Sequence, residues 1–269
     1  MLDVPADELP RRSTGNTAFI SAGSGAPLVF VHGVGMCADA WSPQIEHFSA
    51  RRKVIALDML GHGRSAPPPQ HATLHDYADQ VVRLMDDLGL KTAALVGHSM
   101  GALVCLAVAT QNPARCERIA CLNAVYKRDP ENKAAVQARA RGILAEIGAA
   151  SSNAQTLRRW FGENPTARDR EIAQLTDRWL RDVSRTGYSA AYAVFADSDT
   201  AFVGKLPELA APALFATGEF DPNSTPEMSW QMAAEAKNGQ AEIVAGARHM
   251  MNLTHPAETN RLLNCFLGD

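Results

Sequence analysis

The sequence has no hydrophobic run long enough to cross a membrane. Its longest uninterrupted apolar stretch, residues 102–109, is far shorter than the roughly 20 residues that a transmembrane helix needs. The segment MLDVPADELPRR at the start has acidic residues and prolines where an export signal would have a basic start and an apolar run. We therefore expect a cytoplasmic protein without a membrane partner.

Clusters of positive charge are also missing. The net charge is −3 and the isoelectric point is about 6.2, and no basic block approaches the roughly five or six consecutive like charges that mark a nucleic-acid-binding tail. We therefore expect no nucleic-acid partner.

The patterns of cysteine and histidine that hold metals or disulfides are absent. The five cysteines are scattered and include no C-x-x-C pair, and the eight histidines include no H-E-x-x-H motif. His71 and His75 are four residues apart, but we interpret them as solvated surface at the start of a helix. We predict neither a disulfide framework, nor a metal site, nor an organic cofactor.

What the sequence does contain is an alternation of strand and helix patterns. With 269 residues it is long enough for one large domain or a domain with an insertion. Short apolar runs alternate with longer amphipathic segments, which predicts strands joined by helical crossovers. The fold class is therefore α/β, a mostly parallel central sheet flanked by helices. The predicted strands are 17–21, 27–31, 53–57, 93–96, 118–122, 212–217 and 241–244.

One long segment interrupts this alternation. Residues 126–204 show no convincing strand pattern, whereas apolar residues such as Ile172, Leu175 and Trp179 recur at helical spacing. We interpret residues 124–205 as an inserted helical cap, and residues 1–123 and 206–269 as the core.

The clearest chemical motif is Gly97-His98-Ser99-Met100-Gly101, which has the form G-x-S-x-G. It follows a predicted strand and precedes a helical run, the setting in which this motif presents a nucleophilic serine. A side chain at either glycine position would collide with the neighbouring strand or helix. We predict Ser99 as the nucleophile; the alternative is a glycine-rich turn with a capping serine.

A second motif, His32-Gly33-Val34-Gly35, follows the strand at 27–31. Acyl transfer places negative charge on a carbonyl oxygen, and the loss of one backbone donor to that oxygen typically costs about 3 kcal/mol. We predict the N–H groups of Val34 and Met100 as the oxyanion hole; the alternative for the first is an ordinary glycine turn.

A third motif runs from Asp58 to Ser65 and closes the strand at 53–57. We predict a structural turn in which these two side chains bind local backbone, and we do not favour a catalytic role for His62.

Together, H-G-x-G, D-x-x-G-x-G-x-S and G-H-S-M-G resemble the α/β-hydrolase superfamily, in the branch with a helical cap. The resemblance covers roughly residues 17–123 and 206–269. It implies a chain order of nucleophile, acid and histidine, with the acid after the strand that follows the cap and the histidine after the last strand.

Candidates for both groups occur at the implied places. Asp221 matches the family's G-x-x-D pattern and is preferred to Glu219, while His249 is preferred to His255. Arg248 stands where the family's G-x-G-H pattern has glycine. We predict that neutral His249 takes the serine proton and that Asp221 holds the other ring nitrogen.

The predicted cap supplies candidates for substrate binding. Arg128, Arg158 and Arg159 are each able to clamp a substrate carboxylate through paired hydrogen bonds, although solvated helix surface is the simpler interpretation of each. The full set of candidate substrate-binding residues is His32, Trp41, Arg128, Trp160 and Tyr192.

These observations favour a serine hydrolase that cleaves a small carboxylic ester, lactone or activated amide through an acyl-enzyme. The alternatives are a carbon–carbon bond hydrolase of meta-cleavage-type diketones, against which His98 argues mildly, and an enamine or acyl-enamine hydrolase of nitrogen-heterocycle breakdown. A non-catalytic receptor on the same fold is a third alternative. The expected partner is a small-molecule substrate, and a homo-oligomer remains open.

Overall fold

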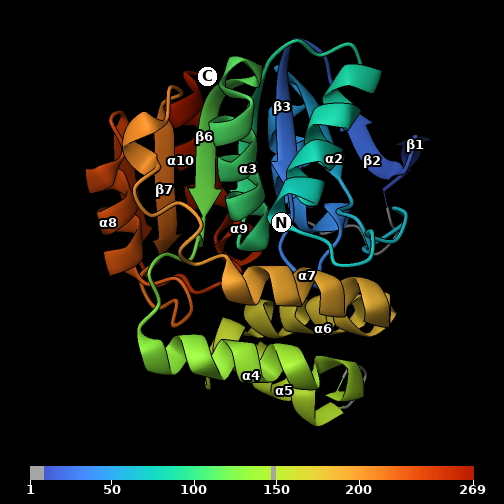
Figure 1. Cartoon of the computed structure of the whole chain (residues 1–269), viewed down its shortest axis with the longest axis vertical. Helices are drawn as coiled ribbons and strands as arrows, with labels where there is room; N and C mark the ends of the chain where they lie inside the picture. The colour runs from blue at the N-terminus through green and yellow to red at the C-terminus, as the bar shows by residue number, and fades with distance from the viewer. Residues whose placement is uncertain (1–8, 147–149) are drawn as a thin grey trace.

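The computed structural model of the chain describes residues 9–146 and 150–269 (Figure 1). The predicted core begins at residue 1 and the predicted cap includes residues 147–149. Both predictions, and the expectation about an export signal, therefore fall partly outside the described residues.

Eight strands within the described residues form one sheet, in the order β1-β2-β4-β3-β5-β6-β7-β8. β1 pairs antiparallel with β2, and β2 with β4, while all other neighbours are parallel. The predicted mostly parallel α/β sheet is confirmed. The strands are β1 (Arg12–Thr14), β2 (Thr17–Ala22), β3 (Ala26–Val31), β4 (Arg52–Leu57), β5 (Ala93–His98), β6 (Cys116–Leu122), β7 (Ala213–Gly218) and β8 (Gly239–Val244).

All seven predicted strands are present, each with ends shifted by at most two residues. β1 was not predicted, because its three residues are polar and lack apolar alternation. It pairs with β2 across Gly15 and Asn16, and Gly15 has a φ of +50°. This glycine-asparagine pair is a hairpin signal that sequence reasoning can use.

Helices cover both faces of the sheet (Figure 1). One face carries α2 (Leu74–Asp87), α3 (Met100–Gln111) and α8 (Pro226–Glu235), and the other carries α1 (Ser42–Phe48), α9 (Met251–Thr254) and α10 (Pro256–Leu267). Short 3-10 helices lie at Ala38–Trp41, Pro113–Arg115 and Leu206–Glu208. Because each face of the sheet is covered, the central strands are apolar on both sides.

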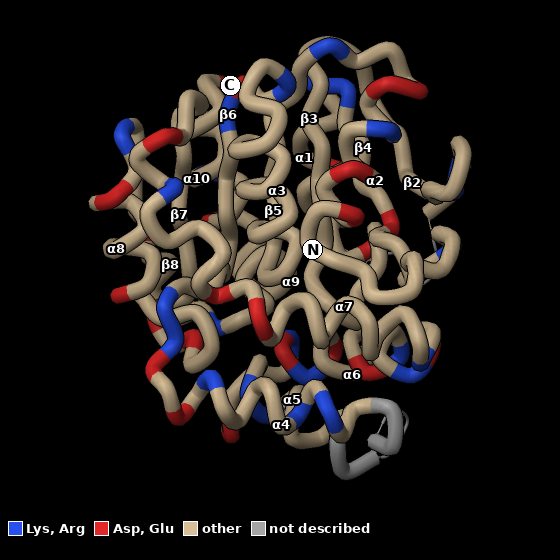
Figure 2. Tube along the Cα trace, viewed as in Figure 1, with Lys and Arg blue, Asp and Glu red and all other residues tan. Residues whose placement is uncertain are grey.

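The apolar character is strongest around the strand and helix that flank Ser99. All six residues of β5 are buried, as are ten residues of α3. In Figure 2 the central strands are almost free of charged residues, whereas Lys, Arg, Asp and Glu are interspersed along the helices that follow β6. The core therefore holds the turn between β5 and α3 rigidly.

Four helices lie between β6 and β7: α4 (Pro130–Glu146), α5 (Ala150–Phe161), α6 (Ala167–Asp182) and α7 (Arg185–Asp197). We refer to them as the helical insertion. They lie across the end of the sheet to which β6 and β7 point (Figure 1). One close contact with the core is at Gly187, where an added Cβ would lie 2.1 Å from the carbonyl oxygen of Gly61. Backbone therefore packs directly on backbone at this point. None of the helices in the described ranges has the length and apolar character that a membrane crossing requires.

Candidate active site

Ser99 occupies a strained turn between β5 and α3. Its φ of 55° and ψ of −118° lie in a region that non-glycine residues rarely adopt. A Cβ added to Gly97 would lie 2.2 Å from the carbonyl oxygen of Gly101. A Cβ added to Gly101 would lie 2.1 Å from the carbonyl oxygen of Val31. Both glycines are therefore required for the sharp turn, for the steric reason expected from the sequence.

The two predicted oxyanion donors lie beside this turn. Met100 is the first residue of α3, so its N–H has no acceptor within the helix. The loop that carries Val34 passes close to the serine, because an added Cβ on Gly33 would lie 3.1 Å from the Cβ of Ser99. Within the described residues, neither the Val34 nor the Met100 N–H donates to another backbone group. Both donors are thus available to a ligand.

His249 and Asp221 form a hydrogen-bonded pair. Nδ1 of His249 lies 2.8 Å from Oδ2 of Asp221, whose side chain is completely buried. Asn123 Nδ2 and the Asn223 N–H also donate to this carboxylate, each at 2.8 Å. Burial alone would raise the pKa of Asp221, but His249 and these donors outweigh it and lower the pKa. An ionised Asp221 fixes the His249 ring, leaving Nε2 free to exchange a proton.

The other two candidates for these positions are placed differently. Glu219 accepts a hydrogen bond from the Gly246 N–H at 2.8 Å, and His255 contacts Thr254. Neither side chain meets the His249–Asp221 pair. The geometry therefore supports the choice of Asp221 and His249.

Two residues around this pair were not assigned a role from the sequence. Asn123 follows β6 with a φ of 52° and reaches Asp221, as described above. His98 lies 2.7 Å from the His249 carbonyl oxygen through Nε2. Burial lowers the pKa of His98 to about 3, so its ring is neutral and donates from Nε2. A position directly after or at the end of a parallel strand is the signal that points to such residues.

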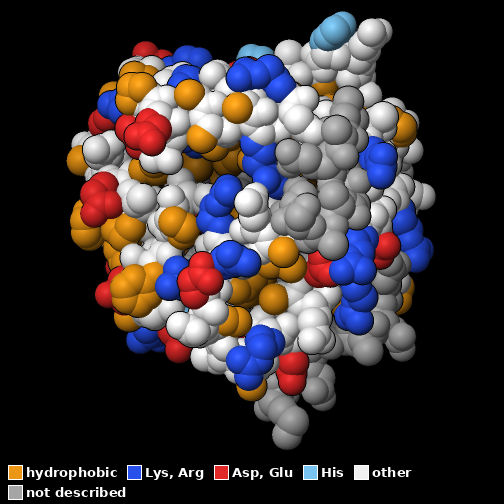
Figure 3. All heavy atoms as spheres, turned by 90° about the horizontal axis from the view of Figure 1, so that it is seen from below, with side chains coloured by type: hydrophobic (Ala, Val, Ile, Leu, Met, Phe, Trp, Pro, Cys, Tyr) orange, Lys and Arg blue, Asp and Glu red, His pale blue; other side chains and the backbone are white. Residues whose placement is uncertain are grey.

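Ser99 and His249 open onto a cavity of about 770 Å³ beneath the helical insertion. The core also contributes Gly33, Val34 and His98, and the insertion contributes Arg139, Arg159, Trp160, Tyr188, Tyr192 and Phe195. Figure 3, which views the molecule from the side of the insertion, shows Lys and Arg side chains around hollows lined by hydrophobic atoms. The cavity thus combines apolar walls with positive charge.

Arg128 is the most buried of these cations. It lines the cavity, its side chain is only 2% exposed, and its Cζ lies 4.5 Å from the ring centroid of Phe195. Nη1 lies 3.7 Å from Oδ1 of Asp199, but within the described residues Nη2 has no hydrogen-bond partner. Burial lowers the pKa of Arg128, and Asp199 opposes this effect. Arg128 therefore carries a buried donor that the described acceptors around it do not satisfy.

Of the other substrate-binding candidates, Trp160 and Tyr192 line the cavity, as does Arg159. Trp160 also faces the His249–Asp221 pair, because its ring lies 5.4 Å from the His249 ring. Arg158 does not line the cavity: it is 60% exposed and lies 3.7 Å from Glu163.

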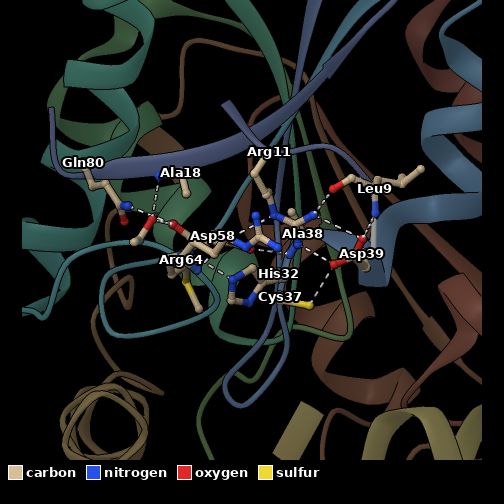
Figure 4. A network of polar contacts seen from close by, with 12 residues as sticks. Leu9, Arg11, Ala18, His32, Cys37, Ala38, Asp39, Asp58, Arg64 and Gln80 are labelled. Carbon is tan, nitrogen blue, oxygen red and sulfur yellow. Dashed lines mark hydrogen bonds and ion pairs between the residues drawn. The ribbon is translucent and has the colours of Figure 1, made fainter. Parts of the chain in front are cut away.

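The prediction that His32 and Trp41 bind substrate is wrong, because both are fully buried behind the cavity. His32 Nε2 accepts from the Met59 N–H at 2.9 Å, and Nδ1 donates to the Gly33 oxygen. Figure 4 shows His32 beside the polar network of Arg11, Asp39 and Asp58. Trp41 packs on Phe30 with ring centroids 4.7 Å apart. Both side chains therefore support the core.

The turn from Asp58 to Ser65 has the local contacts that a structural role requires. Ser65 Oγ donates to the Asp58 oxygen at 2.6 Å, and Asp58 Oδ1 accepts from the Ala38 N–H at 2.8 Å. His62 Nε2 accepts from the Gly35 N–H at 3.0 Å, next to Val34. This turn supports the loop that carries the predicted oxyanion donor.

Among the described residues, no group of His, Cys, Asp and Glu side chains is arranged to hold a metal ion. The chemistry available on these residues is that of a hydroxyl, an imidazole, a carboxylate and backbone donors.

This arrangement is the one that the sequence motifs indicated, and comparison with known proteins agrees on the class. The chain belongs to the α/β-hydrolase family: the family described as alpha/beta hydrolase fold matches residues 26–256. It is therefore an enzyme of the hydrolase class.

Two hydrolases and one esterase structure are similar to this chain over most of its length. The chain is 40% identical to (E)-2-((N-methylformamido)methylene)succinate hydrolase from Acinetobacter baylyi, over 93% of each chain. It is 28% identical to 3-oxoadipate enol-lactonase 1 from the same organism, over 89% of this chain and 88% of that one. Among solved structures, a thermophilic esterase from Thermogutta terrifontis is 26% identical, with a TM-score of 0.85 over 93% of this chain and 92% of that one.

Proposed function

We propose that this chain hydrolyses a small activated acyl compound with at least one carboxylate, most specifically an N-acyl enamine, through an acyl-enzyme on Ser99. The observation that carries the proposal is one cavity lined by Ser99, by His249, which Asp221 holds from behind, and by Arg128, whose Nη2 has no partner among the described residues. The name of the Acinetobacter relative describes an N-acyl enamine of a dicarboxylate, which supports this choice.

The first step forms the acyl-enzyme. Ser99 Oγ attacks the acyl carbonyl carbon while Nε2 of His249 takes the hydroxyl proton, because Nδ1 is held by Asp221. The N–H groups of Val34 and Met100 donate to the oxyanion that develops. The bond from the acyl carbon to the enamine nitrogen then breaks, and His249 returns the proton to the leaving group.

The second step releases the acid. Water attacks the Ser99 ester with His249 again as base, and the products are a carboxylic acid and the free enamine. An enamine or enol is a better leaving group than a simple amine or alcohol anion, because its charge delocalises over the double bond. This feature fits a site in which a histidine, His249, protonates the leaving group.

Arg128 supplies the selectivity for an anion in this proposal. A substrate carboxylate that accepts from Nη2 would satisfy a buried donor that otherwise has no partner among the described residues. The resulting bond is charge-assisted and shielded from water by the insertion. Trp160 and Tyr192 form apolar walls around the rest of the substrate.

The test is a panel of activated acyl and diketone substrates, in which one acid and its methyl ester share the same acyl group and the same scissile bond. The purified chain is assayed on an N-formyl enamine bearing carboxylates, its methyl ester, a carboxylate-bearing enol lactone, p-nitrophenyl acetate and a vinylogous diketone. We expect the highest kcat/KM on the carboxylated acyl enamine. Equal kcat/KM on the acid and its neutral methyl ester would contradict the proposed role of the anion.

Enol-lactone hydrolysis is the second candidate. It is favoured by the relationship to the enol-lactonase, and it uses the same acyl-enzyme steps with an enolate as leaving group. A higher kcat/KM on the enol lactone than on the acyl enamine would make it the preferred function. Turnover of the diketone alone would support the carbon–carbon hydrolase alternative, and binding without turnover would support a receptor.

A further inference from the structure

Arg248 joins two loops of the core that carry the catalytic pair. It immediately precedes His249, and its Nη1 donates to the Phe220 carbonyl oxygen at 3.2 Å, next to Asp221. Its Cζ lies 5.7 Å from the ring centroid of Phe220. The two loops are also paired through the backbone, because the Phe220 N–H donates to the Ala247 oxygen at 2.9 Å. The guanidinium is thus held in place from the core side.

The same guanidinium lies directly against the helical insertion. Gly162 directly follows the last residue of α5 and has a φ of +87°. Its N–H donates to the carbonyl oxygen of Arg158 at 2.8 Å. A Cβ added to Gly162 would lie 2.7 Å from Nε and 2.9 Å from Cζ of Arg248. Glycine at this position therefore lets the flat guanidinium approach the backbone at the end of the helix.

The contact has a favourable charge as well as a close fit. The carboxyl end of a helix carries partial negative charge on its unpaired carbonyl groups, and a cation there is stabilising. Arg248 places its positive charge beside Gly162, at that end of α5. The rigid fork of arginine suits a packed position better than a flexible lysine does.

The last turn of α5 carries Trp160, which lines the cavity and lies over His249. The two rings are 5.4 Å apart with an interplanar angle of 31°. The contact between Gly187 and Gly61 joins backbone to backbone elsewhere in the insertion. At the end of α5, by contrast, a core side chain, Arg248, makes the contact with Gly162.

We propose that Arg248 is a positioning residue that holds the end of α5, and with it Trp160, against His249. The kinetic consequence rests on the proposed function, since it concerns the environment of the proposed base. Trp160 covers one face of the imidazole and restricts water beside it. Loss of Arg248 releases the end of α5 and leaves that face of His249 open.

The kinetic test is a double-mutant cycle between Arg248→Ala and Trp160→Ala, on the best substrate of the panel. We expect Arg248→Ala to lower kcat/KM about tenfold, and to lower it less than about twofold in the Trp160→Ala background. Arg158→Ala removes an exposed guanidinium from the same helix end and keeps the backbone hydrogen bond to Gly162, so we expect it to retain wild-type kcat/KM. A full tenfold loss in the Trp160→Ala background would overturn the proposal, because Arg248 would then act directly on the loops of the catalytic pair.

A second measurement needs no substrate, so it separates this proposal from the proposed function. Acrylamide quenching is recorded for each protein and for its Trp160→Phe counterpart, and the difference isolates the emission of Trp160 from that of the other three tryptophans. We expect the quenching constant of Trp160 to rise about twofold or more in Arg248→Ala and to stay unchanged in Arg158→Ala. Arg248→Lys serves the same comparison where Arg248→Ala does not fold. Unchanged quenching of Trp160 in a folded Arg248 variant would overturn the proposal.

Discussion

The Arg128→Ala variant is expected to lose activity on a carboxylate-bearing substrate and to keep it on a neutral ester. In the wild-type chain the Arg128 side chain is 2% exposed and lines the same cavity as Ser99. Its Nη2 has no partner among the described residues. A carboxylate that binds there replaces its water shell with a charge-assisted hydrogen bond, and the variant removes that bond.

The size of the loss follows from the burial of the contact. A hydrogen bond to a charged group contributes about 1.5–3 kcal/mol. Each change of about 1.4 kcal/mol in the activation free energy alters a rate tenfold. The lost hydrogen bond therefore corresponds to a loss of roughly 10- to 150-fold in kcat/KM. A neutral ester makes no such bond, so its kcat/KM should change less than about threefold.

The variant also leaves Asp199 buried, with Lys133 Nζ at 3.2 Å as its remaining cation. Its free energy of unfolding must therefore be measured, and all rates taken well below its melting temperature. The assay compares a carboxylate substrate with its methyl ester, at the same leaving group, for wild type, Arg128→Ala and Arg158→Ala. The exposed Arg158 is the matched control and should behave as wild type. If Arg128→Ala loses the same factor on both substrates, the arginine supports the structure of the cavity and does not bind the carboxylate.

The remaining predictions concern the catalytic pair and the buried histidines. Ser99→Ala should fold normally but lose hydrolysis of p-nitrophenyl acetate, and residual turnover above about one hundredth of wild type would refute Ser99 as nucleophile. Asp221→Asn should lower kcat by roughly 10³- to 10⁴-fold. Glu219→Gln, which alters a carboxylate that accepts from the Gly246 N–H, should stay within about threefold; equal losses would refute the assignment. Burial lowers the pKa values of His62 and His98 to about 3, so only the unfolded chain takes up these protons as the pH falls below about 6.5. The free energy of unfolding, from urea titrations, should therefore fall by about 1 kcal/mol per histidine between pH 7.5 and 5.5; a pH-independent value would contradict neutral burial.

Much of the fold was predictable because the signals for it are local. Continuous apolar runs mark strands that are buried on both faces, and every residue of β5 and β7 is buried. The polar strand β1 was missed, because it is held by pairing with β2 rather than by burial of its own side chains.

The site was predictable where its geometry depends on neighbouring residues. The turn at Ser99 requires glycine on both sides, and that requirement can be read from five consecutive letters. His32 was misassigned for the opposite reason. It follows a strand that ends at the cavity, but its side chain turns toward the Met59 N–H, a contact that depends on how two loops pack.

The sequence by itself determined the order of strands and helices and the strained serine turn, because apolar periodicity and glycine spacing act over a few residues. The resemblance to the α/β-hydrolases pointed to Asp221 and His249. Only the tertiary structure decided that Arg128 and Arg159 line the cavity and Arg158 does not. Arg128, for example, is placed by Asp199 and Phe195, about 70 residues further along the chain. It also decided that Trp160 lies over His249 and that Arg248 meets Gly162. Such contacts arise from packing of the insertion on the core, which no pattern within either segment specifies.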